Sequence, residues 1–146
     1  REENYDVRWY VLGDGDAEYK AKLSEMLLDA GVADMMLFLG TTTNPYSYLR
    51  DCDIYAQPSR HEGKPISVEE AKIMYKPILA TKYLSAPEQL EGGDLGVLCD
   101  ISSDGIYNGI KQLLDSPKLC DRLTENLAKK KSGNSGEIEK FYDMLK

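Results

Sequence analysis

The sequence predicts an α/β fold, a doubly wound parallel sheet covered by helices on both faces. Short apolar runs alternate with amphipathic segments along almost all of the 146 residues. Some runs are apolar throughout, such as residues 35–39, which is typical of a strand buried on both faces. Strands that alternate with helices pair in parallel through right-handed crossovers, so the alternation indicates one doubly wound domain.

Each expected element has a local signal. Residues 7–12 are rich in β-branched and aromatic side chains and end at a glycine turn, which indicates a strand. Residues 16–30 repeat apolar side chains at helical spacing, and Asn44 before Pro45 is typical of an N-cap followed by proline in the first turn. The same patterns predict strands at 35–39, 53–57, 77–81 and 95–99, and helices at 45–50, 65–75, 86–90, 102–114 and 117–131.

The expected elements form one domain and a tail. Residues 1–131 contain the alternating strands and helices, about the length of a typical domain. Residues 132–146 are expected to be a flexible linker, rich in glycine and serine, and a C-terminal helix. That helix places Phe141, Tyr142 and Leu145 on one face, which suits packing on another domain.

Composition excludes several classes of protein. The net charge of −7 has the wrong sign for binding nucleic acid through its phosphates. No apolar run approaches the roughly 20 residues of a transmembrane segment, and the N-terminus lacks a secretory signal. The three cysteines are widely spaced in apolar segments and the chain has one histidine, so we expect reduced thiols, a cytoplasmic protein and no metal site.

The predicted fold places ligands beyond the carboxyl ends of its strands. This rule selects the loops at residues 13–16, 40–44, 58–65 and 81–86. The first resembles half of a dinucleotide fingerprint, but Glu18 stands where the third glycine would be. We therefore interpret that loop as a tight turn rather than a nicotinamide cofactor site.

The loop at residues 58–65 has the most candidate chemistry. It places a hydroxyl, two cations, an imidazole and a carboxylate on a glycine-containing turn that opens a helix: Ser59, Arg60, His61, Glu62 and Lys64. A helix N-terminus offers unpaired N–H groups and the positive end of a dipole to a phosphate or a developing anion. His61 is interpreted as a loop residue that lines the site rather than as a catalytic base.

Glu70 is the other unusual residue of this segment. Ile66, Ile73 and Met74 predict the buried face of the helix, and Glu70 falls on that face. Its neighbour Glu69 is expected to be solvated. A carboxylate on a buried face needs a partner, so the residues alone leave open a structural cation and a functional role.

Glu62 and Glu70 are separated by seven residues, within Pro58-Ser59-Arg60-His61-Glu62-Gly63-Lys64-Pro65 and Val68-Glu69-Glu70-Ala71. This pattern resembles the E-x7-E motif of the retaining GT-B glycosyltransferases called glycosyl transferases group 1. Further segments agree in order along nearly the whole chain: residues 11–15, 38–40, 48–54, 77–81 and 96–98. The sequence from Glu62 to Pro65 is similar to enzymes of capsular and cell-surface polysaccharide assembly.

The resemblance implies transfer of a sugar from a nucleoside diphosphate sugar to a hydroxyl of a glycan or lipid-linked acceptor, with retention of anomeric configuration. Glu62 would be the catalytic-site glutamate, and Glu70 would hold the ribose hydroxyls. The other implied donor contacts are Ser59, Arg60, Gly63, Lys64 and Pro65 for the sugar and phosphates, and Gly40, Thr41 and Thr42 for the nucleotide. The family needs neither metal nor cofactor.

The resemblance also shows departures. The family's donor domain begins with a strand bearing a Gly-Arg pair, followed by a Lys-Gly pair, and nothing before Tyr5 matches them. Nothing in these 146 residues resembles the N-terminal acceptor domain of the family either. We therefore expect this chain to be the Rossmann-like donor half of a GT-B enzyme, lacking its first strand and inactive alone.

Other functions remain as alternatives. A nucleotide-sugar epimerase or a phosphorylase of the GT-B class would share the fold, although no phosphorylase cofactor lysine motif is found. A non-catalytic receiver-like module would need an aspartate at the carboxyl end of a central strand, and Gln57 stands there instead. The lysines at 129–131 suit either a helix C-terminus or peripheral contact with the inner face of a membrane.

Overall fold

The computed structural model describes residues 5–130. The expected linker and C-terminal helix at 132–146 lie outside the described residues. The chain divides into two compact units, Arg1–Ser47 and Tyr48–Lys146, which are described separately.

The first unit contains two strands and a helix, followed by the start of α2 (Pro45–Asp51). Strands β1 (Trp9–Leu12) and β2 (Met36–Gly40) pair in parallel, and α1 (Ala17–Asp29) connects them. Asp16 caps α1, because its side chain accepts a hydrogen bond of 2.8 Å from the N–H of Tyr19.

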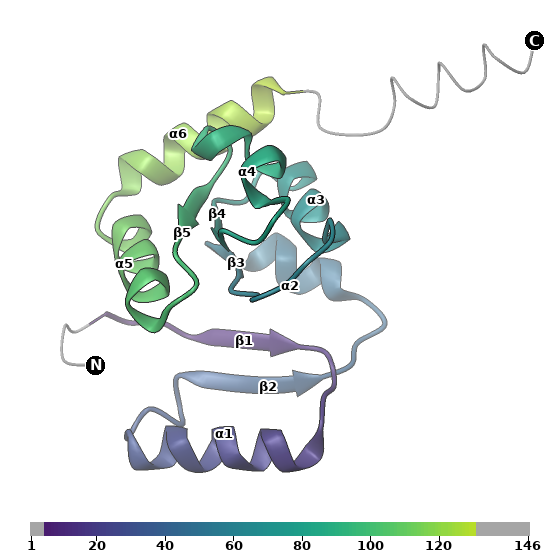
Figure 1. The fold of residues 1–146 in the computed structure, drawn as a ribbon, viewed down its shortest axis with the longest axis vertical. Helices are drawn as coiled ribbons and strands as arrows, with labels where there is room; N and C mark the ends of the chain where they lie inside the picture. Colours follow the sequence, from purple (N-terminus) through teal and green to yellow (C-terminus); the bar gives the residue numbers. More distant parts are fainter. Residues whose placement is uncertain (1–4, 131–146) are drawn as a thin grey trace, which may run out of the picture. The chain divides into compact units, whose positions relative to one another are not determined.

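The second unit is a three-stranded parallel sheet in the order β3–β4–β5 (Figure 1). Its strands are β3 (Tyr55–Gln57), β4 (Ile78–Thr81) and β5 (Val97–Cys99). Its remaining elements are α3 (Ile66–Ile73), α4 (Ala86–Gln89), the 3-10 helix η1 (Glu91–Gly93), α5 (Ser103–Leu114) and α6 (Pro117–Lys129).

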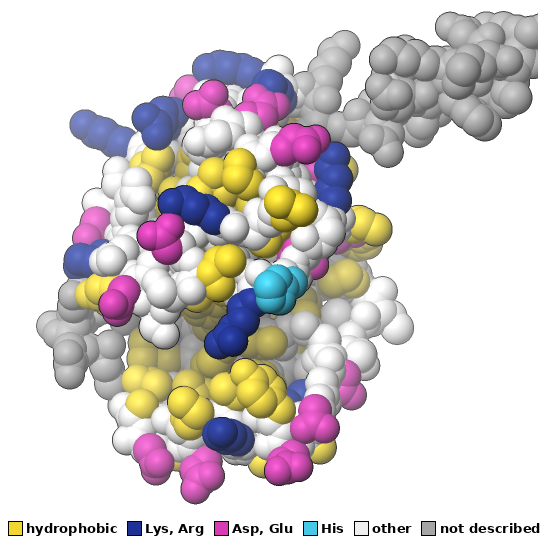
Figure 2. All heavy atoms as spheres, viewed as in Figure 1, with side chains coloured by type: hydrophobic (Ala, Val, Ile, Leu, Met, Phe, Trp, Pro, Cys, Tyr) yellow, Lys and Arg dark blue, Asp and Glu magenta, His cyan; other side chains and the backbone are white. Residues whose placement is uncertain are grey.

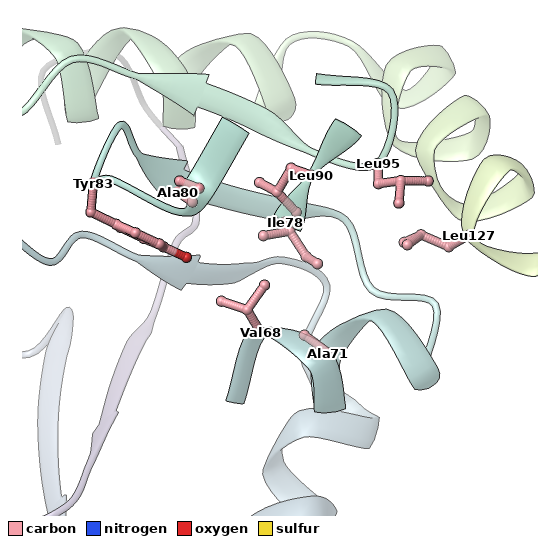
Figure 3. Packing of buried hydrophobic residues seen from close by; sticks show 9 residues of the cluster. Val68, Ala71, Ile78, Ala80, Tyr83, Leu90, Leu95 and Leu127 are labelled. Atoms are coloured by element: carbon pink, nitrogen blue, oxygen red, sulfur yellow. The ribbon is translucent and has the colours of Figure 1, made fainter. Parts of the chain in front are cut away.

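Helices cover both faces of this sheet, and every residue of β4 is buried. On one face, Ile78 and Ala80 pack with Val68 and Ala71 of α3 (Figure 3). On the other face, Leu79 packs with Leu113 of α5. Helix α6 contributes to both sides, through Leu127 and Leu123 respectively.

The predicted alternation of parallel strands and helices is confirmed, with boundaries shifted by one or two residues. The hydrogen bonds divide the five strands into two sheets, β1–β2 and β3–β4–β5, whereas the sequence pattern predicts one. The alternation predicts which segments are strands, but it does not determine which strands are neighbours.

Candidate functional site

The carboxylate of Glu62 is held by a residue of its own loop and by the last residue of β3. Its Oε1 accepts a hydrogen bond of 2.7 Å from the hydroxyl of Ser59 and one of 2.9 Å from the Nε2 of Gln57. Gln57 also donates to the Ser59 hydroxyl at 2.8 Å. The three side chains close a ring of hydrogen bonds, so Glu62 has a defined direction at the carboxyl end of β3.

Gln57 is a member of this site that no sequence motif marks. Its side-chain oxygen accepts from the hydroxyl of Tyr55 and, at 3.4 Å, from the hydroxyl of Ser67. These donors fix which end of the amide faces Glu62. The signal in the sequence was its position as the last residue of a strand, where ligand sites of this fold class occur.

Strand β4 anchors the start of the same loop. The side chain of Thr81 is fully buried and donates to the backbone oxygens of Ser59 and, at 3.3 Å, of Gln57. The carboxyl ends of β3 and β4 are therefore joined beneath the Glu62 loop.

The segment after β4 anchors the end of the loop. Ser85 donates to the backbone oxygen of Gly63, and the Nε2 of Gln89 donates to that of Pro65 at 3.0 Å. Pro65 is the N-cap of α3 and has no side-chain oxygen to accept from the first-turn N–H groups. The α3 N-terminus therefore lacks the side-chain cap that Asp16 gives α1.

The prediction that Ile66 and Ile73 lie on the buried face of α3 is wrong. The side chains of Ile66 and Ile73 are 75% and 51% exposed, whereas Val68 and Ala71 are fully buried. Two sets of apolar residues with helical spacing lie on opposite sides of α3. The smaller side chains, those of Val68 and Ala71, are the ones that pack against β4. Glu70 is half-buried on the more open side, so it is not a carboxylate enclosed in the core.

Glu69 is also placed differently from the prediction. It was expected to be solvated, but it forms an ion pair of 3.0 Å with Lys72 and accepts a hydrogen bond of 3.0 Å from Gln89. Gln89 also accepts from the Tyr83 hydroxyl at 3.1 Å, and its backbone oxygen accepts from Lys72 at 3.1 Å. This Gln89 network joins α4 to the first turns of α3.

An open hollow of about 400 Å³ lies at the outer side of the Glu62 loop. It is lined by Arg60, His61, Glu62, Gly63 and Leu84. Figure 2 shows the histidine in cyan at the surface, beside a basic side chain. Leu84 is 97% exposed at its rim. The hollow brings a carboxylate and basic groups together with an apolar side chain.

The other predicted residues occupy separate positions. Lys64 is exposed, two residues before the start of α3. Gly40 is the last residue of β2 in the first unit, and Thr41 and Thr42 follow it. Gly40 has a φ of +71°, which favours glycine. Thr42 accepts a hydrogen bond of 3.1 Å from the N–H of Asn44. The proposed nucleotide contacts at 40–42 thus lie at the end of β2 and in the segment that leads to α2.

Burial changes the pKa values of two tyrosines near Glu62. Burial raises the pKa of Tyr55, and the nearby carboxylates add to the effect. Burial together with the charge of Glu62 raises the pKa of Tyr83 to about 12. Both hydroxyls therefore stay protonated at neutral pH and act as hydrogen-bond donors.

Within residues 5–130, no group of three or more histidine, cysteine or acidic side chains is arranged to hold a metal ion. None of the described helices is long and apolar enough to cross a membrane. Lys129 pairs with Glu125 at 3.6 Å, and Lys130 pairs with Glu91. These ion pairs favour the interpretation of Lys129 and Lys130 as the basic end of α6; Lys131 lies outside the described residues.

Solved structures share the fold of this chain over part of their own length. Anabaena HepE, in a crystal structure with UDP, superposes with a TM-score of 0.84 over 95% of this chain and 40% of its own, at 22% identity. Staphylococcus aureus TarM, in a structure that also contains UDP, gives a TM-score of 0.77 over 97% of this chain and 29% of its own, at 24% identity.

The sequence also identifies the family. Residues 1–130 match the family described as glycosyl transferases group 1, so the chain belongs to this family. It is 33% identical over 115 residues to the lipopolysaccharide core biosynthesis mannosyltransferase LpsB of Rhizobium meliloti, over 76% of this chain and 33% of that protein.

A second relative matches more of the chain. The N-acetylgalactosamine-N,N'-diacetylbacillosaminyl-diphospho-undecaprenol 4-alpha-N-acetylgalactosaminyltransferase of Campylobacter jejuni is 26% identical over 143 residues, 97% of this chain and 38% of that enzyme. The chain thus spans about two fifths or less of these relatives.

Proposed function

We propose that this chain is the donor-binding half of a retaining glycosyltransferase that uses a nucleoside diphosphate sugar, in cell-surface polysaccharide synthesis. The observation that supports it best is the fixed Glu62 carboxylate in the loop that leads into α3, a helix without a side-chain N-cap, in a member of this family. The HepE and TarM structures contain UDP, which makes a uridine nucleotide the first ligand to test.

The residues suggest a division of roles. Glu62, together with Gly63 and Pro65, contacts the transferred sugar, and its fixed direction suits hydrogen bonds to sugar hydroxyls. Glu70 accepts hydrogen bonds from the ribose hydroxyls, since a carboxylate has two oxygens for a vicinal diol. Gly40, Thr41 and Thr42 border the base.

The donor phosphates lie near the first turn of α3. The N–H groups there and the positive end of the helix dipole favour an anion, and the side chains of Ser59, Arg60 and Lys64 add a hydroxyl and two positive charges. Phosphate charge is neutralised by these groups without a metal ion or a cofactor.

The overall reaction forms a bond between the anomeric carbon and an acceptor hydroxyl. The bond from that carbon to the diphosphate oxygen breaks, the nucleoside diphosphate leaves, and the acceptor proton is released. The acceptor, a glycan or a lipid-linked sugar, is bound by an N-terminal domain beyond these 146 residues. We expect no turnover from this chain alone. The enzyme would act in the cytoplasm or at the inner face of the membrane.

The test is UDP binding by the full-length natural protein, measured by calorimetry. Glu70→Gln should weaken binding by about 10-fold or more, because a charge-assisted hydrogen bond to ribose is lost. Glu62→Gln should leave UDP binding nearly unchanged but lower turnover with a nucleotide sugar. Glu88→Gln, on the exposed side of α4, is the matched control. Wild-type affinity and turnover in both site variants would reject the assignment.

A further inference from the structure

We propose that Gln89 is a positioning residue of this site, which fixes both the end of the Glu62 loop and the rotation of the helix that bears Glu70. The inference rests on the proposed function, because it concerns the same site. Gln89 lies on α4, outside the motif that contains the two glutamates.

The side chain of Gln89 is buried, with 3% of its surface exposed, and each of its polar groups is used. The Nε2 donates to the backbone oxygen of Pro65 and to the Oε1 of Glu69, both at 3.0 Å. The Oε1 accepts from the hydroxyl of Tyr83 at 3.1 Å. A flipped amide would point its oxygen at two acceptors, so the amide has only one favourable orientation.

The hydrogen bond from Gln89 to the backbone oxygen of Pro65 fixes the end of the Glu62 loop. Ser85 holds the backbone oxygen of Gly63 in the same way, from the segment just before α4. No peptide bond of the described chain is cis, so each N–H points opposite to the carbonyl of its own peptide unit. With the carbonyls of Gly63 and Pro65 turned toward the α4 segment, the N–H groups of Lys64 and Ile66 point away from it.

The same residue fixes the rotation of α3. Glu69 accepts from the side chain of Gln89, and Lys72 donates to the backbone oxygen of Gln89 at 3.1 Å. Glu69 and Lys72 are three residues apart, so they lie on one side of the helix. Glu70 follows Glu69 by about 100° around the helix axis, and its direction is therefore set by the pair that Gln89 holds.

A purely structural role would give a different result from a positioning role. Tyr83→Phe provides the matched control, because it removes one hydrogen bond of the same buried network but keeps both bonds that Gln89 donates. If Gln89 only stabilises the fold, the two variants should affect ligand binding alike. If Gln89 positions the site, only its own substitution should weaken binding.

The experiment compares Gln89→Met, Tyr83→Phe and the double variant in the full-length natural protein. The double variant leaves no unpaired buried hydroxyl and serves where Gln89→Met folds poorly. We expect Gln89→Met and the double variant to bind UDP about 10-fold more weakly. Tyr83→Phe should bind within twofold of the wild type while its melting temperature falls.

Hydrogen exchange over residues 63–70 provides a readout that needs no ligand. We expect faster exchange there in Gln89→Met than in Tyr83→Phe. Unchanged UDP affinity in Gln89→Met, or an equal loss in Tyr83→Phe, would overturn the positioning role. If the wild type fails to bind UDP, the proposed donor is wrong, and the exchange rates at 63–70 then decide the role of Gln89.

Discussion

The two units of this chain bury their apolar side chains to very different extents. In the first unit, none of the described residues 5–47 is buried, and α1 has no buried side chain. In the second unit, β4 is buried over its whole length between two clusters of apolar residues. The same kind of sequence, apolar strands between amphipathic helices, thus gives a dense core in one unit and a partly exposed sheet in the other.

The difference follows from the number of strands in each sheet. A central strand exists only in a sheet of three or more strands, and two-stranded sheets are marginal in water. Strand β4 has neighbours on both edges and helices on both faces, whereas β1 and β2 each have one strand neighbour within their sheet. Stability should therefore be concentrated in the second unit, which also contains the Glu62 loop.

The largest contrast is expected from truncating one leucine in each unit. Leu79→Ala should lower the free energy of unfolding by about 2–5 kcal/mol, because Leu79 is 1% exposed and its removal leaves a cavity. Leu37→Ala should cost about 1 kcal/mol, since Leu37 is already partly exposed. Urea unfolding of both variants measures the difference. Equal losses would contradict the uneven distribution of stability.

A smaller effect is expected from adding a methyl group at a glycine. A Cβ at Gly109 would lie 2.5 Å from the Cδ1 of Leu79 and 3.2 Å from the Cβ of Cys99. Gly109→Ala should therefore destabilise the protein by about 1–3 kcal/mol through overpacking. Gly15→Ala, in the first unit, meets no atom within 4 Å and is the control. Equal melting temperatures of the two variants would argue against tight packing of α5 on the sheet.

The buried hydroxyl of Tyr83 predicts a dependence on pH. Tyr83→Phe should be less stable than the wild type by about 1 kcal/mol at neutral pH, because a hydrogen bond to Gln89 is lost. The pKa of Tyr83 is raised to about 12 in the folded protein, above about 10 in the unfolded chain. Its stabilising contribution is therefore complete below pH 10 and is lost as the pH rises to 12.

The measurement is urea unfolding of wild type and Tyr83→Phe from pH 8 to pH 12. The gap between them should narrow above pH 10. Tyr19→Phe removes a tyrosine hydroxyl whose side chain is 62% exposed in the first unit, and it controls for general effects of alkaline pH. A gap that stays constant to pH 12 would contradict the burial of the Tyr83 hydroxyl.

The smallest effects are expected at two matching helix caps. Ser102 accepts a hydrogen bond of 3.0 Å from the N–H of Gly105, as Asp16 does from Tyr19 in the first unit. Ser102→Ala and Asp16→Ala should each cost about 1 kcal/mol for their own helix. Only the Ser102 variant should lower the midpoint of global unfolding, while Asp16→Ala should speed hydrogen exchange in α1 alone. Equal shifts of the global midpoint would show that the units unfold together.

Much of the fold could be predicted because its signals are local. Asp16, Pro45 and Ser102 marked helix starts, and the runs around Met36 and Leu79 marked strands. The rule that ligands bind at the carboxyl ends of strands selects the Glu62 loop without reference to any family. The predictions that failed concern features that depend on long-range packing. Ile66 and Ile73 have the right spacing for a buried face of α3, but that face is open.

The sequence by itself determined the order and type of the elements, the family, and the position of the two glutamates, because each depends on neighbouring residues or on a motif. Only the tertiary structure decided which strands pair, which face of α3 is buried, and what holds the site in place. Gln57 and Gln89 have no motif of their own. Gln89 became part of the site only through contacts with Pro65 and Glu69, which lie 20 or more positions away in the chain.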